Sequence, residues 1–422
     1  MRIKIHEFKK VVNSPVIIGM VVLFIAFNFF LILEHNYMQN ELTVLNKLVD
    51  KLGYEINDEM LTNFQDYYGD ELSKMNEITY AKTSKTYTNV GSFLKEIGDS
   101  YELYKVYTEE ELDYVKQLMV METYLDLIGD MDDEYASLDM MKVAEGQISF
   151  YGLSGSAADT VRSNYLKLGE RLNQLLGNGE HKNMFFIGQI YQMHSLLFDN
   201  VFRVMIFQVI IIIVLITSYL MNYEFENKTP LVIYSTKRGR SIILDKLLVS
   251  IGSGIVATTF IVGITLTGYF SIFSYKGLWH VPISNYFNWE TNFPFISWWN
   301  MSFAQYLISS IILVYICGIL FTVITFILSI FIKNSYISFF TFGILFGLIL
   351  LVPNMMPSSN NLIFLSVFTP FSLILNPQNW FMGKDSFSIF KYYEIITIGA
   401  WSLLLFITGK LSAKKFKKED IY

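Results

Sequence analysis

The chain has 422 residues, of which 52% are hydrophobic and 16% aromatic, and its mean hydropathy is +0.37. This balance is typical of a membrane protein, and with a net charge of −6 we expect no nucleic-acid partner. The single cysteine, Cys317, excludes a disulfide within the chain.

Charge is distributed unevenly along the chain. Residues 34–200 hold 13 Lys and Arg against 29 Asp and Glu, whereas the rest of the chain holds 19 against 9. The acidic block predicts a separate domain outside the membrane, and the basic remainder predicts the membrane part. We therefore divide the chain into 1–34, an extracellular helical domain at 35–200, and 201–422.

The N-terminal segment predicts a helix lying on the membrane, followed by a first span. Residues 1–15 are basic, and Ile3, Ile5, Phe8 and Val12 form an apolar stripe, which is typical of an interfacial helix. Residues 16–33 are long and apolar enough to cross a bilayer. A cleaved signal peptide is the alternative, but the run is too long and no A-x-A site follows it.

Residues 35–200 contain no spanning run and predict an antiparallel helical bundle. Apolar residues recur at spacings of three and four, which buries one face of a helix. Thr108 and Glu111 predict a capping box, residues 148–151 give the best strand signal, and a last helix from Lys182 is expected to continue into the second span. The apolar stripes are Leu42, Leu45, Val49 and Leu52; Tyr114, Leu118, Met121, Leu125 and Ile128; and Val161, Tyr165, Leu168, Leu172 and Leu175.

Five more spans are predicted, at 201–221, 247–273, 304–332, 336–352 and 393–408. Basic residues in the N-terminus, in the loop after the second span and in the tail 410–418 place both termini in the cytoplasm. The loop 274–303 is rich in Trp, Tyr and Phe, which predicts that it lies on the outer leaflet. Residues 358–375 are apolar but interrupted by Pro370, which predicts re-entrant half-helices between spans five and six.

The spans carry few polar residues. Asn28, Gln208 and Gln305 are the notable ones, and Glu394 lies near the outer end of the sixth span. This scarcity argues against proton-driven transport, because ionisable residues at mid-membrane mark ion or proton pathways. Residues 343–347 form a G-x-x-x-G pattern, which permits close packing between helices.

The loop 223–246 is the most informative stretch. It carries Lys228, Lys237, Arg238, Arg240 and Lys246, and these charges keep it cytoplasmic. From Thr229 as N-cap and Pro230 at the first position, a short amphipathic helix is expected within 229–246. On that helix Leu231, Tyr234 and Arg238 would share one face. A cytoplasmic partner could bind such a helix between two spans and displace it.

This loop resembles the coupling segment of ABC-2 type permeases, the membrane subunits of ABC exporters. Lys228 stands where that family more often has Gly. The resemblance implies a coupling helix within 224–246 and a partner ABC ATPase subunit that binds ATP and magnesium. It also implies a second permease subunit that meets this one through spans one and five. Gly343 and Gly347 lie in span five. The residues that match, with Tyr234 added as a coupling residue, are Glu224, Glu226, Thr229, Ser235, Arg238, Gly239, Arg240 and Lys246.

No enzymatic chemistry is visible in the sequence. There is no G-x-x-x-x-G-K-S/T motif, so a second polypeptide would have to bind ATP. The histidines show no metal-ligand spacing, the GLSGS run at 152–156 lacks the last Gly of G-x-S-x-G, and the acidic run 130–134 lacks the Gly and Glu of an EF-hand. We expect no catalytic, cofactor or metal site in this chain.

The sequence thus predicts an all-α polytopic membrane protein of a bacterial cell membrane. The first hypothesis is an export permease for an amphiphilic cargo, a peptide, lipid or drug, with antimicrobial peptide resistance as the expected process. It would contact membrane lipids and work as a dimer with its ATPase. The alternative is a membrane sensor or scaffold whose extracellular domain binds a ligand or a cell-envelope partner.

Overall fold

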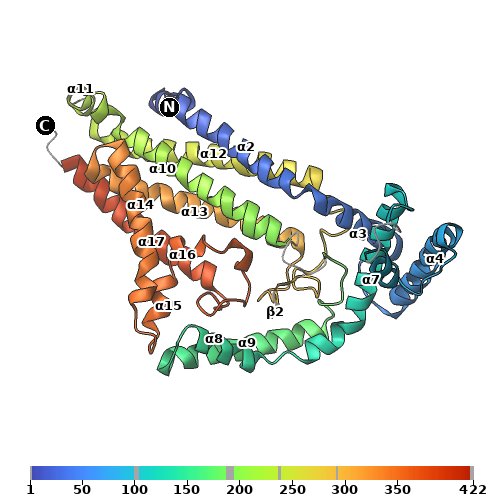
Figure 1. Cartoon of the computed structure of the whole chain (residues 1–422). Helices are drawn as coiled ribbons and strands as arrows, with labels where there is room; N and C mark the ends of the chain where they lie inside the picture. Colours follow the sequence, from blue (N-terminus) through green and yellow to red (C-terminus); the bar gives the residue numbers. More distant parts are fainter. Residues whose placement is uncertain (1, 99–103, 187–193, 236–238, 291–292, 419–422) are drawn as a thin grey trace.

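The computed structural model describes residues 2–98, 104–186, 194–235, 239–290 and 293–418. Within these ranges the chain is almost entirely helical (Figure 1). A short antiparallel ladder pairs β1 (Trp289–Glu290) with β2 (Phe293–Pro294). The long helices form a bundle, and both termini lie at one end of it (Figure 1).

Six helices in the described ranges are long and apolar enough to cross a membrane, as the sequence predicted. Three of them extend beyond the predicted spans: α10 reaches Glu226, α12 begins at Ile242 and α17 continues to Lys418. These extensions lengthen the bundle at the end that holds both termini (Figure 1). The six are α2 (Pro15–Glu34), α10 (Arg203–Glu226), α12 (Ile242–Ile272), α13 (Phe303–Ile332), α14 (Ser335–Leu351) and α17 (Tyr393–Lys418).

Local sequence explains where these helices begin. Pro15 occupies the first turn of α2, where its missing N–H costs nothing. Ser302 and Gln305 form a capping box at the start of α13, so Gln305 caps a helix and does not lie in the middle of a span. The side chain of Asn334 accepts a hydrogen bond from the Ile337 N–H and starts α14 after a two-residue turn.

The helix α10 lies at the centre of the bundle. In its most apolar stretch 72% of the residues are buried, against 17% in α2 and in α14. It packs against α2, α12, α13 and α14. The outer helices α2 and α14 therefore keep broad apolar faces for lipid or for another protein.

A polar cluster lies among the spans. Asn28 and Gln208 exchange two hydrogen bonds of 2.8 Å, and Asn28 donates a third, of 2.9 Å, to the Thr265 hydroxyl. All three side chains are buried. They join α2, α10 and α12 in the way that polar residues hold membrane helices together.

The segment between α2 and α10 folds into helices at the other end of the molecule from the termini (Figure 1). The predicted stripes are largely buried, and the capping box of Thr108 and Glu111 is present. The run 148–151, interpreted as the best strand signal, belongs to a helix and a turn instead. The elements are η1 (Asn36–Met38), α3 (Gln39–Leu52), α4 (Asp58–Thr83), α5 (Val90–Gly98), α7 (Glu109–Ala136), α8 (Met140–Phe150) and α9 (Gly155–Gly177).

Two cores stabilise this segment. A small one is local to α4, α5 and α7 and includes Met75, Phe93 and Leu118. The other, which contains the α9 stripe, is continuous with the core of the membrane helices. The apolar face of α9 thus packs on the loops that join later spans and not only on its neighbours in sequence.

The predicted helix from Lys182 does not begin there. Residues 182–186 are non-helical: the Ile56 N–H donates to the Lys182 carbonyl at 3.0 Å, and the Met184 N–H donates to the Tyr54 carbonyl at 2.6 Å. This strand-like pairing competes with helix formation because it satisfies these backbone groups. The part of the prediction at 187–193 lies outside the described residues, and the π-helical turn η2 (Ser195–Phe202) then leads into α10.

The aromatic loop after α12 is mostly buried within the protein, and its position at the outer leaflet stays a prediction. Tyr286, Phe287 and Trp298 are within the core, and the rings of Tyr124 in α7 and Phe287 pack edge to face at 5.1 Å. The loop packs between the spans and the helices that lie between α2 and α10 in the sequence. Its aromatic content therefore reflects packing between these parts.

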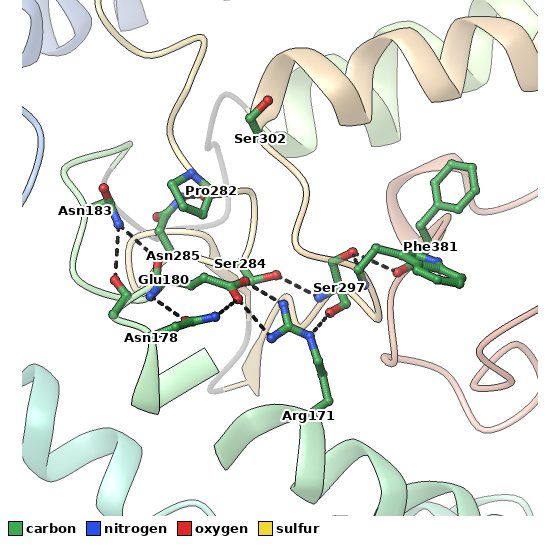
Figure 2. A network of polar contacts seen from close by, with 12 residues as sticks. Arg171, Asn178, Glu180, Asn183, Pro282, Ser284, Asn285, Ser297, Ser302 and Phe381 are labelled. Carbon is green, nitrogen blue, oxygen red and sulfur yellow. Dashed lines mark hydrogen bonds and ion pairs between the residues drawn. The ribbon is translucent and has the colours of Figure 1, made fainter. Parts of the chain in front are cut away.

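Figure 2 shows the polar contacts that fix α9 to this loop. Arg171 forms two hydrogen bonds with the Glu180 carboxylate, and its Nε donates to the Ser297 carbonyl at 3.0 Å. Ser297 in turn donates from its hydroxyl to the Phe381 carbonyl at 3.2 Å. Arg171 and Glu180 are both buried, so the pair is a bidentate contact away from water.

The chain between α14 and α17 forms short helices separated at Pro370, where the sequence predicted a break. They are η4 (Val352–Met355), α15 (Leu362–Val367), α16 (Pro370–Leu373) and η5 (Pro377–Asn379). The Trp401 side chain of α17 donates to the Phe368 carbonyl at 2.9 Å and holds this region against the bundle. That α15 and α16 re-enter the membrane, and that α1 (Arg2–Val12) lies on its surface, stay predictions.

Candidate functional site at the loop between α10 and α12

The loop between α10 and α12 lies at the end of the molecule where both termini lie (Figure 1). It contains the short helix α11 (Pro230–Tyr234) and the 3-10 turn η3 (Gly239–Ser241), and α12 begins directly after η3. Helical structure within 229–246 is thus divided between three elements. Gly239 allows the chain to return to α11, because a Cβ at this position would lie 2.3 Å from the Tyr234 carbonyl oxygen.

The apolar side chains of α11 differ in how far they are exposed. Leu231 is 61% exposed and Val232 is 71% exposed, whereas Tyr234 is 6% exposed. The predicted common face of Leu231 and Tyr234 is therefore wrong, because α11 turns Tyr234 inward. Its ring packs edge to face on Phe416 of α17, at 5.4 Å between centroids.

A buried set of charges lies beneath α11. Glu224, near the end of α10, forms an ion pair with Lys246 of α12 and a second, at 3.0 Å, with Lys10 of α1. Lys10 also pairs with Glu7 at 2.7 Å. The Tyr234 hydroxyl donates to the Glu224 carboxylate at 3.4 Å, so α11 is attached to the same group.

These two carboxylates and two ammonium groups balance in charge, which is what burial away from water requires. Lys246 has no exposed side-chain surface and also donates to the Leu220 carbonyl at 2.5 Å. Burial acts to lower the pKa of Lys10, but its hydrogen bond to Glu7 and the charge of Glu224 outweigh burial and leave that pKa above its ordinary value. Burial, with the charge of Glu224, raises the pKa of the Tyr234 hydroxyl.

Other residues of the loop contact further helices. Glu226 accepts a hydrogen bond of 2.7 Å from the Ser335 N–H at the start of α14. Arg240 donates to the Lys417 carbonyl of α17 at 2.9 Å. The Thr229 N–H donates to the Glu224 carbonyl at 2.9 Å and closes the end of α10. The loop is thus connected to α14 and α17 as well as to α1.

The remaining predicted residues have less prominent positions. The Ser235 hydroxyl donates to the Val232 carbonyl at 3.1 Å within the α11 turn. Arg238 lies outside the described residues. Gly343 and Gly347 are exposed on α14, and a Cβ at either would meet nothing within 4 Å.

Sequence reasoning missed the contribution of α1 to this site. Residues 1–15 were interpreted only as a basic membrane-surface helix, and Lys246 only as one of the basic residues of a cytoplasmic coupling loop. The available signal was the single acidic residue, Glu7, among the basic residues of the first helix. Among the described residues, no group of three or more His, Cys, Asp or Glu side chains could hold a metal ion.

Six apolar helices, with a short helix between the second and third held on buried charges, define a multi-pass helical membrane protein. The family model described as "ABC-2 family transporter protein" matches residues 1–421. The chain therefore belongs to the ABC-2 transporter family, whose members are membrane components. No curated protein and no solved structure matches the chain.

Proposed function

We propose that the chain is the permease subunit of an ATP-driven exporter, and that a separate ABC ATPase subunit docks on α11 from the cytoplasm. The observation that supports this most is the exposure of Leu231 and Val232 on a helix whose other face is fixed by Tyr234. Two exposed aliphatic side chains on a rigid support form the kind of anchor that a groove on a partner can bury.

The contacts of the loop give this anchor a mechanical role. A displacement of α11 would act through Tyr234 on the Glu224 carboxylate, and from there on α1 and α12 through Lys10 and Lys246. It would act on α17 through Arg240. ATP-dependent closure of the partner would in this way be converted into movement of the spans.

The cargo we propose is an amphiphile, a peptide, lipid or drug, moved outward, with antimicrobial peptide resistance as the process. The scarcity of charged side chains among the spans supports this class over small inorganic ions. A second permease subunit would meet this one at the exposed face of α14 that carries Gly343 and Gly347, where close approach of another helix is sterically open.

The test is substitution of the exposed anchor. Leu231→Asp with Val232→Asp should leave the protein folded and inserted, because both side chains are exposed. The same change should abolish co-purification of the ATPase subunit or uncouple ATP hydrolysis from transport. Arg238→Glu with Arg240→Glu tests the basic part of the loop in the same assay, and charge reversal at a desolvated contact costs roughly 2–5 kcal/mol or more.

The matched control is Lys415→Glu with Lys418→Glu, at two exposed positions in the last turns of α17. It should change assembly much less. Full assembly and full coupled transport in the Leu231 and Val232 double variant would show that α11 is an ordinary connector and would refute docking of the ATPase on it.

A further inference from the structure

A cavity of about 200 Å³ lies far from the α11 loop, between the short helices that follow α14 and the start of α17. It is smaller than the roughly 300 Å³ at which pockets for drug-sized ligands begin, so it suits a small molecule or one group of a larger one. Its walls are largely apolar and aromatic, with Val367, Leu373, Trp380, Phe387 and Tyr393 among them.

Two acidic side chains face this cavity, Asp385 from the loop before α17 and Glu394 from its first turn. Glu394 is 4% exposed, and its Oε1 accepts a hydrogen bond of 2.7 Å from the Phe381 N–H. The Asp385 carboxylate accepts from the Phe387 N–H at 3.2 Å and from the Tyr151 hydroxyl. In the described part of the chain no Lys, Arg or His forms an ion pair with either carboxylate.

The lysines closest in sequence contact aromatic rings. The ammonium group of Lys384 lies 3.7 Å from the centroid of the Phe295 ring, and that of Lys391 lies 4.8 Å from the Trp299 ring. Burial raises the pKa of the Asp385 carboxyl above its ordinary value, the direction expected for an acid without a cation beside it. The two carboxylates thus lack a compensating cation among the described residues, which is costly for buried charges.

The two aromatic hydrogen-bond donors of the cavity wall already have acceptors within the protein. The Trp380 indole N–H donates to the Leu373 carbonyl at 2.8 Å, and the Tyr393 hydroxyl donates to the Val367 carbonyl at 2.8 Å, so both aromatic donors are occupied. Two carboxylates and aromatic rings together favour a cation and disfavour an anion.

We propose that this cavity binds an organic ammonium group that carries a short apolar chain. The carboxylates of Glu394 and Asp385 receive the charged head, and the apolar walls receive the chain. The same chemistry is offered by a free amphiphilic amine and by the headgroup of an aminophospholipid, so the experiment distinguishes these two sources. The site does not depend on the ATPase docking proposed above.

The experiment measures binding of hexylammonium to the full-length protein in neutral maltoside micelles by isothermal titration calorimetry. Hexanol, which has the chain without the charge, serves as the matched ligand. The protein should bind hexylammonium and not hexanol, and Glu394→Gln should weaken binding roughly tenfold or more, the effect of losing one charged contact. Glutamine keeps an oxygen that can accept from the Phe381 N–H, so the fold should persist. Asp385→Asn is the second variant. Asp66→Asn, at an exposed site on α4, is the control.

Two lipid arms identify the source of the amine. If a headgroup occupies the site, added phosphatidylethanolamine should compete with hexylammonium whereas phosphatidylglycerol should not, and this competition should be lost in Glu394→Gln. Absence of competition, with hexylammonium binding intact, assigns the site to a free amine. Equal binding of hexanol, no binding of hexylammonium, or unchanged affinity in both Glu394→Gln and Asp385→Asn would overturn the proposal.

Discussion

The buried ion pair of Glu224 and Lys246 gives a quantitative test of how the α11 loop is supported. Lys246→Met removes one charge from a set that is balanced, and leaves Glu224 with Lys10 as its remaining cation at 3.0 Å. Glu224→Leu is more severe, because it leaves Lys246 and Lys10 buried with Glu7 as the one carboxylate of the set. Breaking a buried pair costs about 3–5 kcal/mol, and we expect Lys246→Met at the lower end and Glu224→Leu at the upper end.

The double variant Glu224→Leu with Lys246→Met restores the match between the charges that remain, Glu7 and Lys10. Its loss of stability should therefore be smaller than the sum of the two single losses by about 2 kcal/mol or more. Unfolding in mixtures of a mild detergent and dodecyl sulfate, followed by tryptophan fluorescence, measures the three values. Lys410→Met, at an exposed site on α17, is the control and should change nothing measurable. Additive losses, or a Lys246→Met variant as stable as the parent, would refute the balanced-charge argument.

Three further predictions concern other parts of the fold. Gly239→Ala should destabilise the loop and lower ATPase co-purification, because its Cβ would lie 2.3 Å from the Tyr234 oxygen, whereas Gly343→Ala, with open space around it, should fold as the parent does. Arg171→Met should cost about 3–5 kcal/mol and increase hydrogen exchange in α9, since it leaves the buried Glu180 carboxylate without its cation; unchanged exchange in α9 would contradict this. Leu118→Asp should cost several kcal/mol by placing an unpaired charge in the small core, with exchange rising in α4, α5 and α7 and not in α9.

The sequence was sufficient to predict the six spans, the apolar stripes of α3, α7 and α9, and the capping box at Thr108. These features depend on local periodicity and capping, which a single sequence displays. Prediction from the sequence failed where the local structure depends on residues that are far apart in the chain. Residues 182–186 pair with residues 54–56 instead of forming a helix, and the aromatic loop after α12 packs on α7 and α9.

The candidate site shows the same division. The start of α11 follows from Pro230 at its first position, because the Thr229 side chain makes no capping hydrogen bond. The inward turn of Tyr234 depends on Phe416, which lies 182 positions later in the chain. The role of Lys10 depends on a still more distant partner, Glu224, which lies 214 positions later. Charged residues are rarely buried unless they are paired, and pairing between such distant residues is not visible in a sequence.

The helix α17 connects the α11 loop with the cavity proposed to bind an ammonium group. With 26 residues it extends about 39 Å. Near one end Phe416 packs on Tyr234 of the α11 loop, and at the other Tyr393 and Glu394 line the cavity. An α-helix resists bending over this length, so a tilt imposed at Phe416 would change the position of Glu394 relative to Asp385 and α16. We therefore expect ligand binding in the cavity and partner binding at α11 to influence each other. The coupling free energy between two such sites is the same in both directions.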